Sequence, residues 1–242
     1  MTTAIDLDLA IAKKVLAVVD AGLSEGVGKP EPGFMCVEAA VCYALGLPHG
    51  DEPECVSSAL RSLKIALNDK PWSSKKARAK GLRRLALAQL GSRGALDDRE
   101  FAKRVAELAI RKFKAGLLEA AYRCEAAGTR DAASYAAAAD YASYAASYAA
   151  AAAAYATKAT SYATATAAAA AAAAAAAYAA AYADYAAAYA AAYAAYAAAD
   201  ADAAKKKAYD EVLSGFAEGV VQILIGMRAP GCQWLSLTES QP

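Results

Sequence analysis

The chain has 242 residues, and its 26 lysine and arginine residues nearly balance 25 aspartate and glutamate residues, which leaves a formal net charge of +1. This balance excludes a protein that is strongly basic or strongly acidic as a whole. The five cysteines are an odd number, and the first residues carry aspartates where a secretory leader needs basic and then apolar residues. We therefore expect reduced thiols in a cytoplasmic protein. The long apolar tract is alanine, which favours lipid too weakly to predict a membrane span.

The first 128 residues predict a string of helices divided by glycine and proline. Apolar residues at helical spacing indicate a first helix over residues 5–23 and a second over 34–45, which is apolar nearly all round except for Glu38. That composition places the second helix at the centre of the fold. A loop over residues 47–53 leads into a third helix, whose apolar stripe recurs every three or four residues at Val56, Leu60, Leu63 and Leu67.

Two further helices complete this region. Trp72-Ser73-Ser74 is typical of a helix N-cap and predicts a fourth helix, which Gly91 and Gly94 close. Acidic residues open a fifth helix, from Asp97 to about Ala127, as the helix dipole favours. No alternating pattern of a strand occurs, so the predicted fold is all-α, with residues 1–128 as an N-terminal helical bundle.

Residues 129–204 form a low-complexity insert that consists almost entirely of alanine and tyrosine. Neither glycine nor proline occurs from residue 129 to residue 214, and alanine is the best helix former, so helix is favoured. At about 100° per residue, a first group of tyrosines falls within a sector about 60° wide and a second within about 80°, centred on the opposite side of a straight helix. The first group is Tyr141, Tyr144, Tyr148, Tyr155 and Tyr162, and the second is Tyr178, Tyr182, Tyr185, Tyr189, Tyr193 and Tyr196.

We interpret the insert as a projecting antiparallel helical hairpin. The predicted bend is residues 157–166, where threonine and serine crowd together and weaken helix. A hairpin returns the chain to its starting point and lets the tyrosines cover the seam between two alanine helices. One continuous long helix and partial disorder are the alternatives.

Residues 205–242 have ordinary composition again. Apolar residues from Val212 to Met227 predict an amphipathic helix, which Ala229-Pro230-Gly231 ends. Such a helix has to bury its apolar stripe, so we expect it to pack back on the N-terminal bundle.

Three segments carry a resemblance to known sequences. Residues 32–49 read PGFMCVEAAVCYALGLPH, residues 72–74 read WSS, and residues 229–235 read APGCQWL. With these segments the chain resembles uncharacterised bacterial proteins in which a helical N-terminal region and a C-terminal segment bracket an Ala/Tyr-type insert. The composition also gives a looser likeness to alanine-rich immunity proteins of bacterial toxin systems. The resemblance implies no activity and no catalytic residues.

Candidate catalytic and metal-binding groups gather near the second helix, but each has a simpler explanation. His49 with Cys36, Cys42 or Cys55 could form a Cys–His nucleophile or a Cys3His zinc site. The spacings do not match paired zinc ligands, and cysteines on an apolar helix are usually small hydrophobic residues. Glu38 could line a functional pocket with Cys42 and His49. Alternatively, it could form an internal ion pair or a backbone contact, with an arginine of the fourth helix or with the Gly/Pro loop. We predict no catalytic residue, no metal and no cofactor.

The fourth helix begins with six positive charges in ten residues: Lys75, Lys76, Arg78, Lys80, Arg83 and Arg84. Such a cluster could bind nucleic acid or another polyanion. Alternatively, it is a solvated face that the chain's own acids neutralise, either Asp51, Glu52 and Glu54 or Asp200 and Asp202.

The leading functional hypothesis is a non-enzymatic interaction or scaffold protein that self-associates or binds a protein partner. Tyrosine provides large contact area at low entropic cost, which suits a stripe on an alanine helix to binding another helix. The candidate binding residues are Tyr141, Tyr148, Tyr155, Tyr162, Tyr178, Tyr182, Tyr185, Tyr189 and Tyr196. Polyanion binding and toxin neutralisation are the alternative functions.

Overall fold

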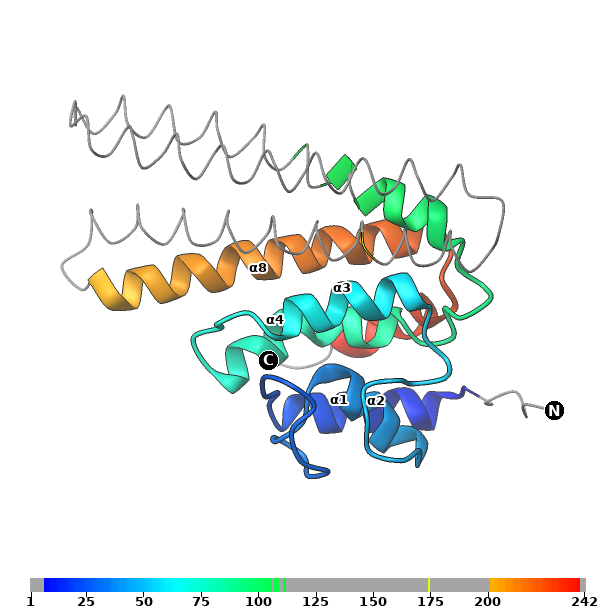
Figure 1. Ribbon diagram of the computed structural model, residues 1–242, viewed down its shortest axis with the longest axis horizontal. Helices are drawn as coiled ribbons and strands as arrows, with labels where there is room; N and C mark the ends of the chain where they lie inside the picture. Colours follow the sequence, from blue (N-terminus) through cyan, green and yellow to red (C-terminus); the bar gives the residue numbers. More distant parts are fainter. Residues whose placement is uncertain (1–6, 106, 109–110, 112–173, 175–200, 240–242) are drawn as a thin grey trace.

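The computed structural model describes residues 7–105, 107–108, 111, 174 and 201–239 (Figure 1). In this part of the chain the fold is all-α, as the sequence predicts, and its β-type contact is an isolated antiparallel bridge between Gly28 and Met35. The elements are α1 (Leu9–Asp20), α2 (Val37–Leu45), α3 (Ser58–Asn68), α4 (Lys75–Ala88), a helical segment that begins at residue 98, α8 (Ala201–Gly226) and the 3-10 helix η1 (Pro230–Thr238).

Side chains at the N-caps decide where the helices begin. Ser74 is the N-cap of α4, as predicted, and its Oγ accepts a hydrogen bond from the backbone N–H of Ala77 at 3.1 Å. Ser57 does the same for α3, where its Oγ accepts from Leu60 at 3.3 Å. Each cap satisfies one N–H that the first helical turn leaves without a backbone acceptor.

The first two helices are shorter than the predicted ranges 5–23 and 34–45. Asp8 caps α1 through a hydrogen bond from the Ile11 N–H to its Oδ1 at 2.8 Å, and Gly22, at φ +119°, ends the helical path soon after Asp20. Met35 and Cys36, directly before α2, are extended, and the Met35 carbonyl accepts from Ser24 N at 3.0 Å. The hydrogen bond to this loop keeps residues out of α2 that the apolar pattern alone predicts to be helical.

Helix α4 lies at the centre of the described fold, where it packs against α1, α2, α8 and η1. Its buried residues include Leu82, Leu85 and Leu87, which have no exposed surface. Helix α2, which the sequence places centrally, is also buried along most of its length and packs against α1, α3 and α4. In Figure 1, α1 and α2 form one end of the bundle, and α8 runs along the other.

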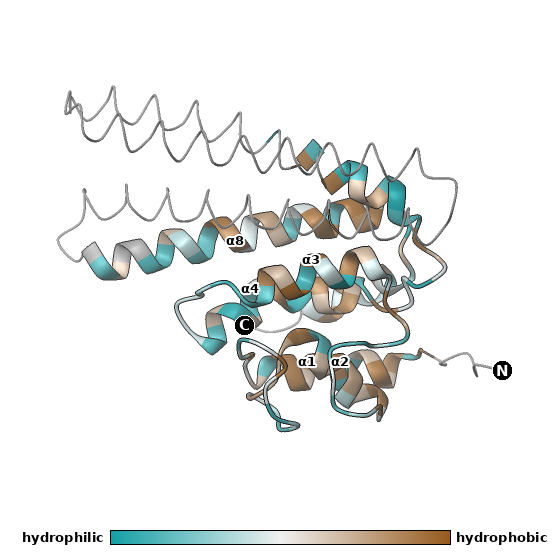
Figure 2. Ribbon diagram, viewed as in Figure 1, coloured by the Kyte–Doolittle hydropathy of each residue, from teal (hydrophilic) through white to brown (hydrophobic). Residues whose placement is uncertain are grey.

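The C-terminal helix α8 lies along α4. Figure 2 shows hydrophilic residues in its first turns and hydrophobic residues in its second half. Asp202, Lys206 and Lys207 are exposed, whereas Leu213 and Val220 are fully buried. The apolar half therefore provides core, and the first turns extend past the other described helices (Figure 1).

The segment that begins at residue 98 runs antiparallel to α8. A Cβ atom placed on Gly219 would lie 2.9 Å from Cδ2 of Leu108, and one placed on Gly226 would lie 3.7 Å from Nη1 of Arg104. As residue numbers rise from Arg104 to Leu108, the neighbouring positions on α8 fall from Gly226 to Gly219. The two chain segments that flank the Ala/Tyr insert therefore share one core.

The predicted hairpin, its bend at residues 157–166 and both tyrosine stripes lie outside the described residues. The domain boundaries at residues 128 and 204 stay predictions. No described helix combines the length and the apolarity that crossing a membrane requires.

Candidate functional site

The basic residues of α4 mostly bind carbonyl and carboxylate groups of the chain itself. Lys75 Nζ donates to the Gly33 carbonyl at 3.0 Å and lies 3.7 Å from the centre of the Phe34 ring, a cation–π distance. Lys76 Nζ donates to the Asp20 carbonyl at 2.6 Å. Both lysines keep exposed surface, but each also fastens the start of α4 to a neighbouring loop or helix end.

Arg78 is buried and serves the core. Its Nε donates to the Asn68 carbonyl at 2.7 Å, Nη1 donates to the Leu23 carbonyl at 3.0 Å, and Nη2 donates to the Lys70 carbonyl at 3.2 Å. Burial lowers the pKa of the guanidinium from its usual value, although an arginine in a protein stays protonated. One side chain therefore satisfies carbonyls at the end of α3, in the loop after it and in the loop after α1.

Arg83 and Arg84 join α4 to three other elements. Arg83 makes a two-pronged ion pair with Asp20, with Nε–Oδ1 and Nη2–Oδ2 distances of 2.7 and 3.0 Å, and also donates to the Thr238 carbonyl. Arg84 Nε donates to Glu218 Oε2 at 3.0 Å. Among the described residues, the carboxylates that pair with the basic cluster are thus Asp20, Glu218 and, 4.0 Å from Arg84 Nη1, Glu239.

Two of the acidic partners proposed from the sequence, Asp51 and Glu52, were wrong. Asp51 and Glu52 instead pair with Arg61 of α3, each at 2.9 Å, because the loop that carries them folds against α3 and not against α4. Lys80 is exposed and has no ion pair or hydrogen bond with a described residue. Polyanion binding stays a prediction, but five of the six candidate charges already contact groups within the chain.

Glu38 forms an ion pair inside the core, with a partner other than the expected arginine. Lys64 of α3 places Nζ 3.2 Å from Glu38 Oε1, and both side chains are 0% exposed. Beyond this contact, Nζ and both Glu38 oxygens have no hydrogen-bond partner. Burial raises the pKa of Glu38 and lowers that of Lys64, while the attraction between the two charges opposes both shifts.

The thiols near this ion pair are held in the neutral form. Burial raises the pKa of Cys36, Cys42 and Cys55, and for Cys42 to about 11. A thiolate is the nucleophilic form of cysteine, so these shifts work against a Cys–His nucleophile. His49 is exposed, and its Nε2 lies 3.1 Å from the Gly28 carbonyl, so it bridges two loops. Among the described residues, no cluster of histidine, cysteine and carboxylate side chains could hold a metal ion.

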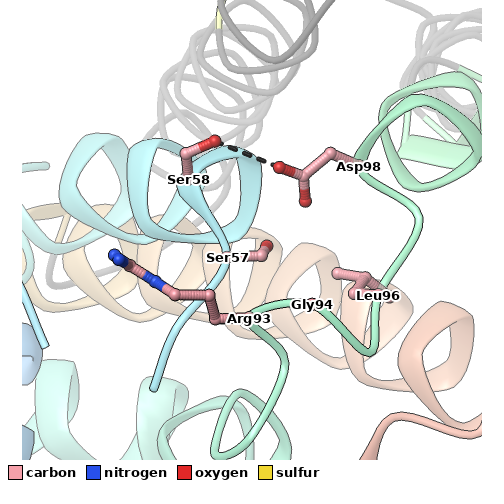
Figure 3. A pocket seen from close by; sticks show the side chains of 6 residues that line it. All are labelled: Ser57, Ser58, Arg93, Gly94, Leu96 and Asp98. Atoms are coloured by element: carbon pink, nitrogen blue, oxygen red, sulfur yellow. Dashed lines mark hydrogen bonds between the residues drawn. The ribbon is translucent and has the colours of Figure 1, made fainter. Parts of the chain in front are cut away.

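A separate cavity of about 310 Å³ opens where α3 begins (Figure 3). Ser58 Oγ donates to Asp98 Oδ2 at 3.0 Å across it, and Arg93 Nε donates to the Val56 carbonyl at 3.2 Å. Ser57 at its base is anchored because its N–H donates to Ser92 Oγ at 2.9 Å. The cavity is lined by Ser57, Ser58, Arg93, Gly94, Leu96 and Asp98.

Sequence reasoning missed Lys64 and the residues of this cavity. Lys64 lies four residues after Leu60 and one after Leu63, so the apolar stripe of α3 places it on the buried face, and that spacing could have identified it. The cavity brings the start of α3 together with residues 93–98, and no local pattern predicts that approach. The nine candidate tyrosines lie outside the described residues.

Together these residues define an all-α bundle with a buried Lys–Glu pair, internally paired basic residues and a small polar cavity. No family model, curated protein or solved structure matches this chain. The resemblance to bacterial proteins with an Ala/Tyr insert therefore stays a prediction.

Proposed function

We propose that this chain is a non-enzymatic interaction protein, in which the helical bundle is a base for the Ala/Tyr segment and the tyrosines bind another copy or a protein partner. The observation that carries the proposal is the antiparallel packing of Leu108 against Gly219. It supports a base on which the flanks of the insert are held against each other. A segment anchored at both flanks loses less entropy on binding than one anchored at a single end.

Contacts at the start of α4 and along α8 add support for a firm base. The Asp210 carboxylate accepts hydrogen bonds from both the N–H and the hydroxyl of Ser73, with an N–Oδ1 distance of 3.0 Å. Farther along α8, Glu218 pairs with Arg84. These contacts join α8 to α4 on either side of the buried Leu213.

The chemistry of the described residues favours binding over catalysis. The thiols near Glu38 are neutral and buried, and the acid and base of the Glu38–Lys64 pair are enclosed in the core. We also propose a compartment that keeps thiols reduced, because Cys36, Cys42, Cys55 and Cys232 are all unpaired.

The test replaces three tyrosines of the second stripe, Tyr182, Tyr189 and Tyr196, by serine. Sedimentation velocity over a range of concentrations and crosslinking measure self-association, and affinity capture with the purified chain measures partner binding. The matched control replaces Ala183, Ala190 and Ala197 by serine, which adds the same hydroxyls one residue away from the stripe. We expect association to be lost in the tyrosine variant and kept in the control. A monomer with no partner, unchanged by the three Tyr→Ser substitutions, would overturn the proposal.

A further inference from the structure

Most of the large apolar side chains that the described residues expose lie at one end of the bundle. Four of the five belong to α1, to α2 or to the loop between them, and in Figure 1 these elements form the end that lies away from α8. The four side chains are Leu9, Val27, Phe34 and Tyr43. Exposed apolar side chains that gather in one region mark a protein-binding surface more often than single ones do.

The outer side of α1 carries two lysines between small side chains. Lys13 and Lys14 are exposed, and neither forms an ion pair with a described residue. Lys14 Nζ lies 5.8 Å from the centre of the Tyr43 ring, so α2 continues this surface. The exposed positions of α1 and its C-cap recur at helical spacing, and together with Tyr43 we call them the α1 face: Ala10, Lys13, Lys14, Ala17 and Ala21.

The loop at the end of α1 repeats the combination of lysine and exposed aromatic ring. A Cβ atom on Gly33 would lie 3.2 Å from the Ala21 carbonyl oxygen, so this loop packs against the end of α1. The next residue, Phe34, is 50% exposed, and Lys75 Nζ lies 3.7 Å from the centre of its ring. This end of the bundle therefore suits a partner that combines small or aromatic side chains with carboxylates.

The Ala/Tyr insert has this chemistry, and its two groups of tyrosines differ in charge. Residues 178–200, which hold the second group, contain Asp184 and Asp200 and no lysine or arginine, whereas the charged residue of the first group's segment, residues 141–162, is Lys158. Aspartates attract Lys13 and Lys14, and the faces of tyrosine rings attract the same ammonium groups. Charge therefore favours the second segment as the occupant of the α1 face.

We propose that the α1 face binds residues 178–200 of a second copy of this chain. The inference rests on the proposed function and names the surface that the tyrosines contact. A second copy is the occupant because α4 lies between α1 and α8, so the flank of the insert that α8 anchors is on the far side of the bundle (Figure 1). Reciprocal docking, in which each copy supplies one segment and one α1 face, closes as a twofold dimer.

The test measures self-association of the full chain by sedimentation velocity over a range of concentrations. Lys13→Glu/Lys14→Glu reverses the charge of the α1 face and should raise the dissociation constant about tenfold or more. Lys80→Glu/Lys103→Glu reverses the same number of charges at exposed positions of α4 and of the segment that begins at residue 98, and should leave association unchanged. Circular dichroism melting checks that each variant is folded.

A mixing experiment separates this inference from the proposed function. The Lys13→Glu/Lys14→Glu chain keeps its tyrosines, and the chain with Tyr182, Tyr189 and Tyr196 replaced by serine keeps its α1 face. Each variant alone should be monomeric, but an equimolar mixture should form a dimer through one intact contact. Failure of the mixture to associate, or association of the lysine variant as strong as that of the parent chain, overturns the inference and leaves tyrosine-mediated association standing. A monomeric parent chain overturns both the inference and self-association.

Discussion

Lys64 and Glu38 face each other inside the core, with 3.2 Å between Nζ and Oε1 and no exposed surface on either side chain. Taking two charges out of water is expensive, and their attraction has to offset that cost. Here the offset is incomplete, because neither group gains a further hydrogen bond. The pair therefore contributes less to stability than its distance alone suggests, and removing one partner is worse than removing both.

The first prediction compares Lys64→Met with the double variant Lys64→Met/Glu38→Leu. The single change leaves a carboxylate alone in the core and should lower the free energy of unfolding by about 3–5 kcal/mol, whereas the double variant should come within about 1 kcal/mol of the parent chain or exceed it. Urea unfolding followed by circular dichroism measures both. A double variant that loses as much as the sum of the two single changes would show that the pair is not coupled.

The elements that sequence predicted well depend on short-range chemistry. Ser74 caps α4 because a hydroxyl reaches an N–H three residues away, and any chain with that local sequence offers the same contact. Arg83 instead pairs with Asp20, which lies 63 residues earlier in the chain, and no local sequence pattern predicts that ion pair. For the same reason the sequence allowed an internal ion pair for Glu38 but offered an arginine of the fourth helix or the Gly/Pro loop as its partner, and not Lys64.

The start of α2 shows the opposite error: the local apolar pattern predicts a helix from residue 34, but α2 begins at Val37. Residues 34–36 are apolar and suit a helix by composition, but Phe34 lies in a turn, since its N–H donates to the Glu31 carbonyl at 2.9 Å, and Met35 and Cys36 are extended. The cavity at Arg93 and Asp98 was beyond local reasoning altogether, since three loop residues and two helix starts meet only in the folded chain.

The second prediction concerns Arg78, whose guanidinium donates to three carbonyls at 2.7, 3.0 and 3.2 Å. Arg78→Lys keeps the charge but cannot reach three separate acceptors, so it should lower the free energy of unfolding by roughly 2 kcal/mol or more. Lys80→Ala lies two residues along the same helix on an exposed face and should change stability by no more than about 0.5 kcal/mol. Equal effects of the two substitutions in urea unfolding would contradict the role assigned to Arg78.

The third prediction concerns Cys42, whose pKa is raised from 9.0 to about 11 by burial. The folded state keeps the thiol proton while the unfolded state releases it, so the neutral thiol contributes stability below pH 9.0 that is lost as the pH rises through about 11. The parent chain should therefore lose stability over this window more steeply than Cys42→Ala, by up to about 1.4 kcal/mol per pH unit. Unfolding curves of both proteins at several pH values measure the difference, and parallel pH profiles would argue against it.

The last prediction uses two glycines in helix interiors that face different surroundings. A Cβ atom at Gly81 of α4 would lie 2.4 Å from two ring carbons of Trp72 and 2.8 Å from Ser214 Oγ, whereas one at Gly215 of α8 would meet nothing within 4 Å. Trp72 cannot easily retreat, since it is 7% exposed and its Nε1 donates to the Leu67 carbonyl at 2.9 Å.

Gly81→Ala should therefore lower the free energy of unfolding by about 1–3 kcal/mol through overpacking. Gly215→Ala should raise it by about 0.5–1 kcal/mol, because alanine restricts the unfolded chain and favours helix. Both changes add one methyl group to a helix interior, so the opposite signs isolate the contact between α4 and Trp72. Urea midpoints with unchanged slopes would establish the difference, and two stabilising substitutions would mean that Trp72 does not pack against Gly81 in solution.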